Sequence, residues 1–282
     1  MMIEKPKTET WKKFIKNWSR ITSPGRPTKK ETEIYRKFGL LRLKKKGTKV
    51  LVLGSTPEIR DMLAKHKNIQ VYLIDINIDN SFAMSELMKN RKAKEKEVWM
   101  KANWLTAPLP ENYFDLIYGD FVVCNIPFKK QDKFLINIKT WLKKNGLFIT
   151  RCETIKPEYK NLSFEKFCCL FENKPVNLKT INHFWELGVY LGEIGKENRF
   201  SPGVFYKHLR DYLEKYPNKN VEKILKTGGI LYPLEWTWSL CMEKRIKSLF
   251  SRHFTIKREE FDPKINFFYP DWYPIYCLKP KK

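Results

Sequence analysis

The sequence predicts an α/β fold of the doubly wound type, with a mostly parallel seven-stranded sheet, an antiparallel terminal hairpin, an N-terminal helical arm and a helical insertion. Two observations lead to this prediction. From residue 49 onward, apolar stretches without polar alternation are separated by helical stretches, which is typical of parallel strands covered on both faces. The last two apolar stretches are joined by a direct connection, which is most simply an antiparallel hairpin because a parallel return needs a crossover.

The strands are predicted where short apolar runs, rich in Val, Ile, Leu, Tyr and Phe, end at Gly, Asp or Asn. The helices are predicted where apolar residues recur every three or four positions. In chain order, the strands are expected at 49–54, 69–77, 97–104, 113–120, 145–153, 254–261 and 272–280. The helices between them are expected at 55–66, 80–94, 131–144 and 233–253.

Four segments follow from this pattern. Residues 1–48 are expected to form a basic helical arm, residues 49–154 a Rossmann-like core, residues 155–233 a helical insertion or lid, and residues 234–282 the helix and hairpin that complete the core. Within the arm, Thr28 is expected to cap a second helix. One helical face of the arm carries Trp11, Phe14, Ile15, Trp18 and Ile21.

Charge and composition limit the classes of function. The net charge is +24, and residues 1–49 carry 16 basic and 4 acidic residues, which makes half of the excess. Such an arm attracts phosphate groups, so nucleic acid stays open as a partner. Most of the basic residues are lysines, however, and an excess of lysine can also result from a biased base composition of the genome. No apolar run is long enough to span a membrane and the start resembles no secretory signal, so we expect a cytoplasmic protein. The six cysteines show no CxxC spacing, so no metal site is expected.

The stretch KVLVLGSTPEIRDML, residues 49–63, locates the expected site, because a buried strand runs through Gly54 directly into a helix. In a doubly wound sheet, ligands bind outside the carboxyl ends of the strands, where the first turn meets the first helix. The absence of a side chain at Gly54 lets a ligand approach the backbone. Ser55 or Thr56 is expected to cap the helix, and Pro57 suits its first position.

Two acidic residues indicate which ligand this turn accepts. A dinucleotide site uses several glycines in a GxGxxG pattern, whereas Gly54 stands alone here, and Glu58 would repel a pyrophosphate at the helix N-terminus. Asp75 ends the next strand 21 residues later, where a carboxylate accepts hydrogen bonds from both ribose hydroxyls of an adenosine. The alternative is that Asp75 only caps the following helix. The pattern favours an adenosine ligand without a pyrophosphate.

Four segments in this order, VLVLGSTPE, VYLIDIN, KANWLTAPLPENYFDLIYGD and LKKNGLFITR, resemble the class I S-adenosylmethionine-dependent methyltransferases over about residues 48–152 and the terminal hairpin. The resemblance implies that S-adenosyl-L-methionine is the cofactor. It also implies that Gly54, Ser55 and Thr56 lie under the methionine portion, and that Asp75, with Ile76 and Asn77, holds the ribose. Asn103 and Trp104 would frame the adenine, and Gly119 and Asp120 would close the site beneath the sulfonium.

Three segments contain candidates for a role in catalysis. Asp120 ends the fourth strand, where a carboxylate is placed to contact the sulfonium or a substrate proton; the alternative is a turn-forming Asp. CNIPF, with Asn125 and Phe128, resembles the motif with which ribosomal RNA adenine dimethyltransferases hold a flipped base; the alternative is a helix cap and a buried aromatic ring. His183 lies in the aromatic insertion, either as a general base or as a core residue.

The function expected from these residues is methyl transfer from S-adenosylmethionine to a small-molecule acceptor held between arm, lid and the crevice above Gly54 and Asp120. Two alternatives remain open. An RNA methyltransferase would use the basic arm and the NIPF segment, and a noncatalytic binder of cofactor or nucleic acid would account for the single glycine of the first motif.

Overall fold

A computed structural model describes residues 25–155, 159, 161–194, 199–228, 237–265 and 267–282. A seven-stranded sheet in the order β11-β12-β5-β4-β1-β2-β3 forms its centre. Strands β1 to β5 pair in parallel, and β12 pairs antiparallel to both β5 and β11, which confirms the predicted sheet and its terminal hairpin. The helical face expected in the arm at 11–21 lies outside the described residues.

The elements appear in the predicted order, but the helix expected at 80–94 ends at Ser85 and is followed by a separate 3-10 helix. The sheet consists of β1 (Thr48–Leu53), β2 (Ile69–Asp75), β3 (Glu97–Lys101), β4 (Phe114–Asp120), β5 (Leu142–Arg151), β11 (Phe254–Glu260) and β12 (Ile275–Pro280). Its helices are α2 (Lys29–Leu43), α3 (Pro57–Leu63), α4 (Ile78–Ser85), the 3-10 helix η2 (Arg91–Lys96), α5 (Phe128–Trp141) and α10 (Glu243–His253).

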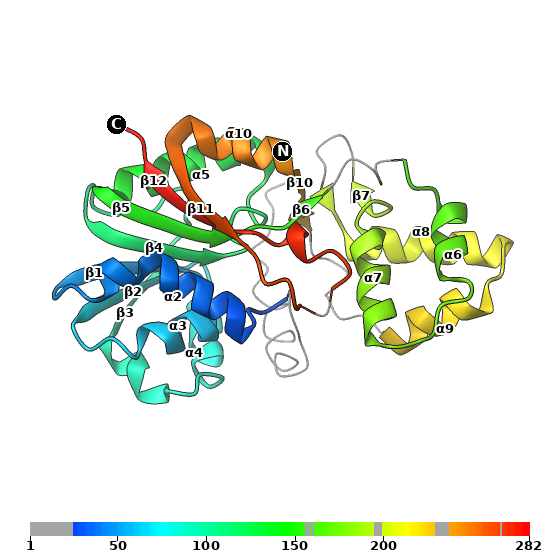
Figure 1. Ribbon diagram of the computed structural model, residues 1–282, viewed down its shortest axis with the longest axis horizontal. Helices are drawn as coiled ribbons and strands as arrows, with labels where there is room; N and C mark the ends of the chain where they lie inside the picture. Colours follow the sequence, from blue (N-terminus) through cyan, green and yellow to red (C-terminus); the bar gives the residue numbers. More distant parts are fainter. Residues whose placement is uncertain (1–24, 156–158, 160, 195–198, 229–236, 266) are drawn as a thin grey trace.

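Helices cover both faces of the sheet, as Figure 1 shows. On one face, α5 and α10 pack through a fully buried cluster that includes Phe134, Ile138 and Phe250. On the other face, α2 and α3 pack through a second cluster that includes Tyr35 and Ile59. Because every central strand is buried on both faces, its sequence is a continuous apolar run.

One helix begins later in the structure than the sequence predicted. The helix expected at 233–253 begins only at Glu243, and residues 233–236 lie outside the described residues. Before Glu243 the chain forms the short strands β9 (Trp238–Ser239) and β10 (Cys241–Met242), and β10 pairs in parallel with β6 (Thr154–Ile155). The aromatic stretch was therefore mistaken for a helical face, because periodicity alone does not separate short buried strands from a helix.

A lobe of helices lies beyond the carboxyl ends of the parallel strands (Figure 1). It contains α6 (Phe164–Phe171), α7 (Leu178–Gly188), α8 (Pro202–Lys215) and α9 (Lys219–Gly228), with the short strands β7 (Glu193–Ile194) and β8 (Arg199–Phe200). Its apolar cluster also includes Trp272 and Tyr273 from the connection between β11 and β12. The same connection therefore belongs to the sheet and to the packing of the lobe.

Helix α2 is anchored at its N-terminus by a buried ionic network. Thr28 caps the helix in a capping box with Glu31, as predicted. The Glu31 carboxylate is fully buried and pairs with the Arg151 guanidinium at 2.6 Å. On its other side, Arg151 contacts Asp120 through two hydrogen bonds of 2.8 and 2.9 Å. Although burial alone lowers the pKa of Arg151, these two carboxylates hold it above its usual value.

Candidate functional site

Gly54 forms a tight turn at the carboxyl end of β1. Its φ angle is +79°, a left-handed conformation that favours glycine, and its backbone N–H donates to the Ile74 carbonyl at 2.9 Å. Pro57 is the first residue of α3, as predicted. Thr56 occupies the cap position, but its side chain makes no capping hydrogen bond, so the predicted side-chain cap is wrong.

Asp75 and Trp104 border the space above this turn. A Cβ atom placed on Gly54 would lie 3.9 Å from Asp75 Oδ2 and 3.9 Å from the Trp104 ring. Asp75 Oδ1 accepts a hydrogen bond from the Asn77 backbone N–H at 2.9 Å. Burial raises the pKa of Asp75 to about 6. The structure thus brings together three residues that the sequence assigned to one ligand.

The other residues assigned to ribose and adenine lie around Asp75 and Trp104. The Trp104 indole donates to the Ile74 carbonyl at 3.0 Å, which fixes the ring beside Gly54. Asn77 is buried and caps α4 with its side chain, whereas Ile76 is 42% exposed. Asn103 is exposed, and its carbonyl oxygen accepts from the Leu105 backbone N–H, so that oxygen is already engaged.

Asp120 ends β4 next to Gly119, and its carboxylate is engaged on both oxygens. Besides the two bonds from Arg151, Asp120 Oδ1 accepts a hydrogen bond from the Tyr35 hydroxyl at 2.9 Å. The Tyr35 hydroxyl in turn accepts from the Arg151 backbone N–H at 2.9 Å. Asp120 therefore links β4 to α2 and β5, and both of its oxygens already accept hydrogen bonds within this network.

A second ion pair, which the sequence did not indicate, lies at the start of α3. Arg26 Nε donates to Glu58 Oε1 at 2.8 Å, whereas Glu58 Oε2 is buried and has no hydrogen-bond partner. Burial raises the pKa of Glu58, Arg26 lowers it, and the negative charge of Asp120 adds to the increase. Glu58 therefore lies in the first turn of α3, directly after the Gly54 turn, with one buried oxygen that has no hydrogen-bond partner.

In the segment after β4, the side chains of Asn125 and Phe128 contact neighbouring parts of the protein. The Asn125 amide donates to the Phe121 carbonyl at 3.0 Å, within the same turn. Phe128 is buried as the first residue of α5, and the Arg245 guanidinium lies 3.9 Å from its ring centre. These contacts engage the amide and one ring face that the RNA hypothesis assigns to a base. Phe121, directly after Asp120, has a positive φ of 54°.

Two carboxylates that sequence reasoning missed lie where the lobe meets the sheet. Glu153 follows β5, and its backbone N–H is 3.5 Å from the sulfur of Cys124. Burial raises the pKa of Glu153 to about 7, although Arg151 nearby lowers it. Glu186 on α7 accepts hydrogen bonds from the backbone N–H groups of Phe268 and Tyr269. Burial raises the pKa of Glu186 to about 8, and the charge of Glu153 adds to the shift.

No local motif could have found these two carboxylates. Their positions result from contacts between segments that are far apart in the sequence. For Glu153 alone the position gave a signal, because it lies just past the strand in the sequence TRCE, at the ligand-binding edge of the sheet.

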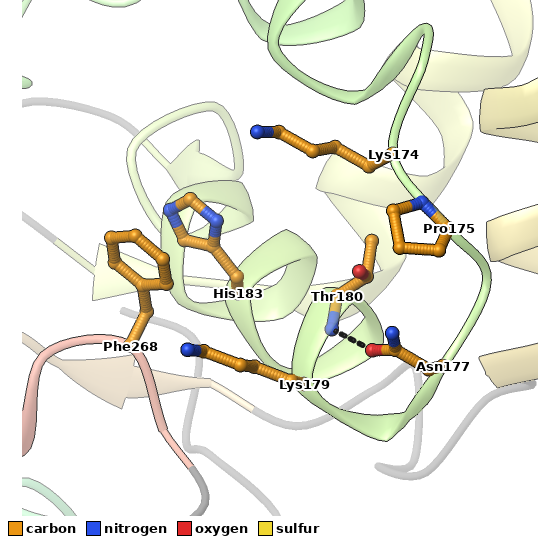
Figure 2. A pocket seen from close by; sticks show the side chains of 7 residues that line it. All are labelled: Lys174, Pro175, Asn177, Lys179, Thr180, His183 and Phe268. Carbon is orange, nitrogen blue, oxygen red and sulfur yellow. Dashed lines mark hydrogen bonds between the residues drawn. The ribbon is translucent and has the colours of Figure 1, made fainter.

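His183 lies on α7, apart from the group around Gly54. Its ring stacks on Phe268, with 4.0 Å between ring centres and 9° between planes. Burial lowers the pKa of His183 to about 4, and Lys174 and Lys179 lower it further. The residue faces a pocket that none of the residues around Gly54 lines (Figure 2).

The site has the chemistry of a positively charged, phosphate-free nucleoside ligand. The Gly54 turn leaves space that a side chain would fill, Asp75 Oδ2 faces that space, and the unpaired Glu58 oxygen offers an acceptor for an ammonium group. Glu58, in the first turn of α3, opposes a pyrophosphate at the helix N-terminus. The residues present therefore fit S-adenosylmethionine, whose sulfonium and ammonium groups are cationic.

Comparisons with known proteins agree with this geometry. The family model described as a methyltransferase domain matches residues 56–150. No curated protein matches the sequence significantly. None of the described helices has the length and apolarity needed to cross a membrane.

Several solved structures share the fold of this chain. A protein from Rhodobacter sphaeroides, provisionally described as a zinc-dependent alcohol dehydrogenase, has a TM-score of 0.60 at 13% identity and covers 99% of this chain and 100% of its own. The PH0226 protein from Pyrococcus horikoshii OT3 has a TM-score of 0.54 at 12% identity, over 94% and 99%. The N-methyltransferase NodS from Bradyrhizobium japonicum WM9, in complex with S-adenosyl-L-homocysteine, has a TM-score of 0.50 at 11% identity, over 99% and 100%.

Proposed function

Because residues 56–150 belong to a methyltransferase domain of the class I, S-adenosylmethionine-dependent type, we propose that this chain methylates a small-molecule acceptor bound between the sheet and the helical lobe. The sheet order supports the domain assignment. In the classic dinucleotide-binding fold the sixth strand extends a parallel sheet, whereas here the antiparallel β12 lies between β5 and β11.

The proposal about the acceptor rests on the position and the pKa of Glu153. When bound, S-adenosylmethionine supplies a methyl group whose carbon the acceptor attacks while the sulfur keeps the bonding electrons. Such a displacement needs alignment, exclusion of water and, where the nucleophile is protonated, a base. Within the described residues, no group donates a hydrogen bond to the Glu153 carboxylate, and its pKa of about 7 suits a base at neutral pH.

The charge around Glu153 favours an amine as the acceptor. Glu153 and Glu186 face the same region closely enough for the charge of one to raise the pKa of the other. At neutral pH the raised pKa values leave this pair partly protonated, and a bound ammonium group would favour its ionised form, whereas a phenolate or a carboxylate substrate would be repelled by it. Glu153 would accept the proton that the amine nitrogen loses, and the aromatic rings of Phe121 and Tyr273, 6.3 Å apart, border the same junction.

The first test of the proposal is binding of the cofactor by isothermal titration. S-adenosylmethionine and S-adenosylhomocysteine are expected to bind with micromolar affinity and NAD is not. The loaded protein is then supplied with small amines, with carboxylic acids and phenols of similar size, and with RNA, and S-adenosylhomocysteine release is measured. Turnover with RNA that falls steeply with salt, and none with amines, would contradict the small-molecule proposal.

Glu153→Gln is expected to lower kcat by about 10²- to 10⁴-fold, because it keeps the size of the side chain and removes the base. Affinity for S-adenosylmethionine should stay unchanged, since Glu153 lies outside the group around Gly54. The matched control is Glu172→Gln, at an exposed position of the lobe. An unchanged kcat at every pH for Glu153→Gln would remove its proposed role.

Cofactor affinity is expected to depend on pH through Asp75. Because burial raises its pKa to about 6, the carboxylate is ionised in neutral solution and takes up a proton as the pH falls through 6. Protonation removes an acceptor for the ribose hydroxyls, so the Kd for S-adenosylmethionine should rise about tenfold per pH unit below 6. The same titration with Asp75→Asn should show no such rise in Kd.

A further inference from the structure

The pocket beside His183 has features of a second ligand site. It is an open hollow with a volume of about 220 Å³, between the start of α7 and the connection from β11 to β12. Its walls are Lys174, Pro175, Asn177, Lys179, Thr180, His183 and Phe268. Figure 2 shows the two lysine side chains extending along either side of the stacked His183 and Phe268 rings. The pocket therefore combines an apolar wall with two cationic groups.

The positive charge of this pocket lacks an internal counterpart. In the part of the chain that the structure describes, neither Lys174 nor Lys179 forms an ion pair with a carboxylate. Lys179 lies over the Phe268 ring, 5.6 Å from its centre, which keeps its ammonium group at the pocket. His183 Nε2 is buried and has no hydrogen-bond partner. A buried nitrogen without a partner is costly, so the protein alone leaves the polar atom of His183 unsatisfied.

The walls of the pocket are held in place by the surrounding structure. Asn177 caps α7 by accepting from the Thr180 backbone N–H at 2.9 Å (Figure 2). Opposite, the backbone N–H of Phe268 donates to Glu186 on the same helix at 2.9 Å. Tyr269, the next residue, stacks on Trp272 with 4.4 Å between ring centres. Helix and connection are thus tied together, so the pocket does not need to form on binding.

We propose that this pocket binds a small anion, a carboxylate or phosphate group carried on an apolar body, between Lys174 and Lys179 and against His183. The ammonium groups supply the charge, and Pro175 and the Phe268 edge contact the apolar part. The site is separate from the group around Gly54, and its proposed ligand does not depend on methyl transfer. A neutral molecule of the same shape lacks the ionic contacts and binds more weakly.

The NMR signal of the His183 ring proton tests the proposal in the whole protein. The chain contains four histidines, and His183→Asn identifies the signal by its loss. The probes are benzoate, benzyl alcohol as its neutral counterpart, inorganic phosphate and, at equal ionic strength, chloride. Benzoate is expected to shift the signal saturably and to raise the pKa of His183 from its low value, because an anion offsets Lys174 and Lys179. Benzyl alcohol and chloride should leave that pKa unchanged.

Lysine variants separate the pocket from unspecific binding. Lys174→Met combined with Lys179→Met should abolish the response to benzoate and raise the pKa of His183 in the free protein, because two repelling charges are gone. Lys144→Met, at an exposed position in the sheet half, should leave the response intact. A response to phosphate and not to benzoate would assign the site to phosphate compounds. Equal responses to benzoate and benzyl alcohol, or a response that survives in the double variant, would overturn the proposal.

Discussion

Asp75→Ala is expected to abolish binding of S-adenosylmethionine and S-adenosylhomocysteine while the protein stays folded. A carboxylate that accepts from two ribose hydroxyls contributes about 3 to 6 kcal/mol, since hydrogen bonds to charged groups are worth about 1.5 to 3 kcal/mol each. Affinity should therefore fall by about 10²- to 10⁴-fold, measured by isothermal titration. The matched control is Asp79→Ala, an exposed carboxylate in the first turn of α4.

The stability of this variant separates a binding role from a structural one. Burial raises the pKa of Asp75 to about 6, above the usual value of 3.8, so the ionised carboxylate destabilises the folded state above pH 6. Asp75→Ala should therefore be at least as stable as the natural protein at pH 8, with the difference shrinking as the pH falls below 6. Unchanged cofactor affinity in Asp75→Ala would remove the ribose assignment.

Arg151→Met is expected to lower the free energy of unfolding by about 3 to 5 kcal/mol. The substitution leaves the buried carboxylates of Glu31 and Asp120 without their cation, and breaking a buried pair by removing one partner has a cost of this size. Chemical denaturation followed by circular dichroism measures the change. Part of the loss should return when Glu31→Gln and Asp120→Asn are added, because the unpaired charges are then gone.

A surface pair provides the control for Arg151. Lys143 contacts Asp115 at 2.8 Å, with side chains that are 42% and 25% exposed. Lys143→Met should change stability by less than about 1 kcal/mol, because solvent screens exposed pairs. If Arg151→Met has an effect as small as Lys143→Met, the network does not hold the strand ends together.

The backbone architecture was largely predictable from sequence because its signals are local. A single glycine at a strand end, an acidic residue one strand later and Pro57 at a helix start were enough to place the Gly54 turn and Asp75 together. The capping box at Thr28 was found for the same reason, since Glu31 lies three residues away. In each case the physical cause lies within a few residues or follows from the order of parallel strands.

The electrostatic design of the site was not predictable, because it depends on contacts across the chain. Asp120 was a candidate for a chemical role, with a turn-forming Asp as the alternative, yet its carboxylate pairs with Arg151. The position of Arg151 opposite Asp120 depends on the register of β4 and β5. No catalytic sequence motif includes Glu153. Sequence reasoning considered His183 as a general base, because histidine titrates near neutral pH, with a core residue as the alternative. The structure places His183 beside a separate pocket, with a low pKa.

The position of β12 also has a consequence for the synthesis of this protein. Residues 275–280 form an internal strand between β5 and β11, although they follow all other strands of the sheet along the chain. While a ribosome is still translating the preceding segments, β5 and β11 have no strand between them, and an open sheet edge pairs readily with other chains. The nascent polypeptide can therefore complete its sheet only after residue 280 has emerged from the exit tunnel.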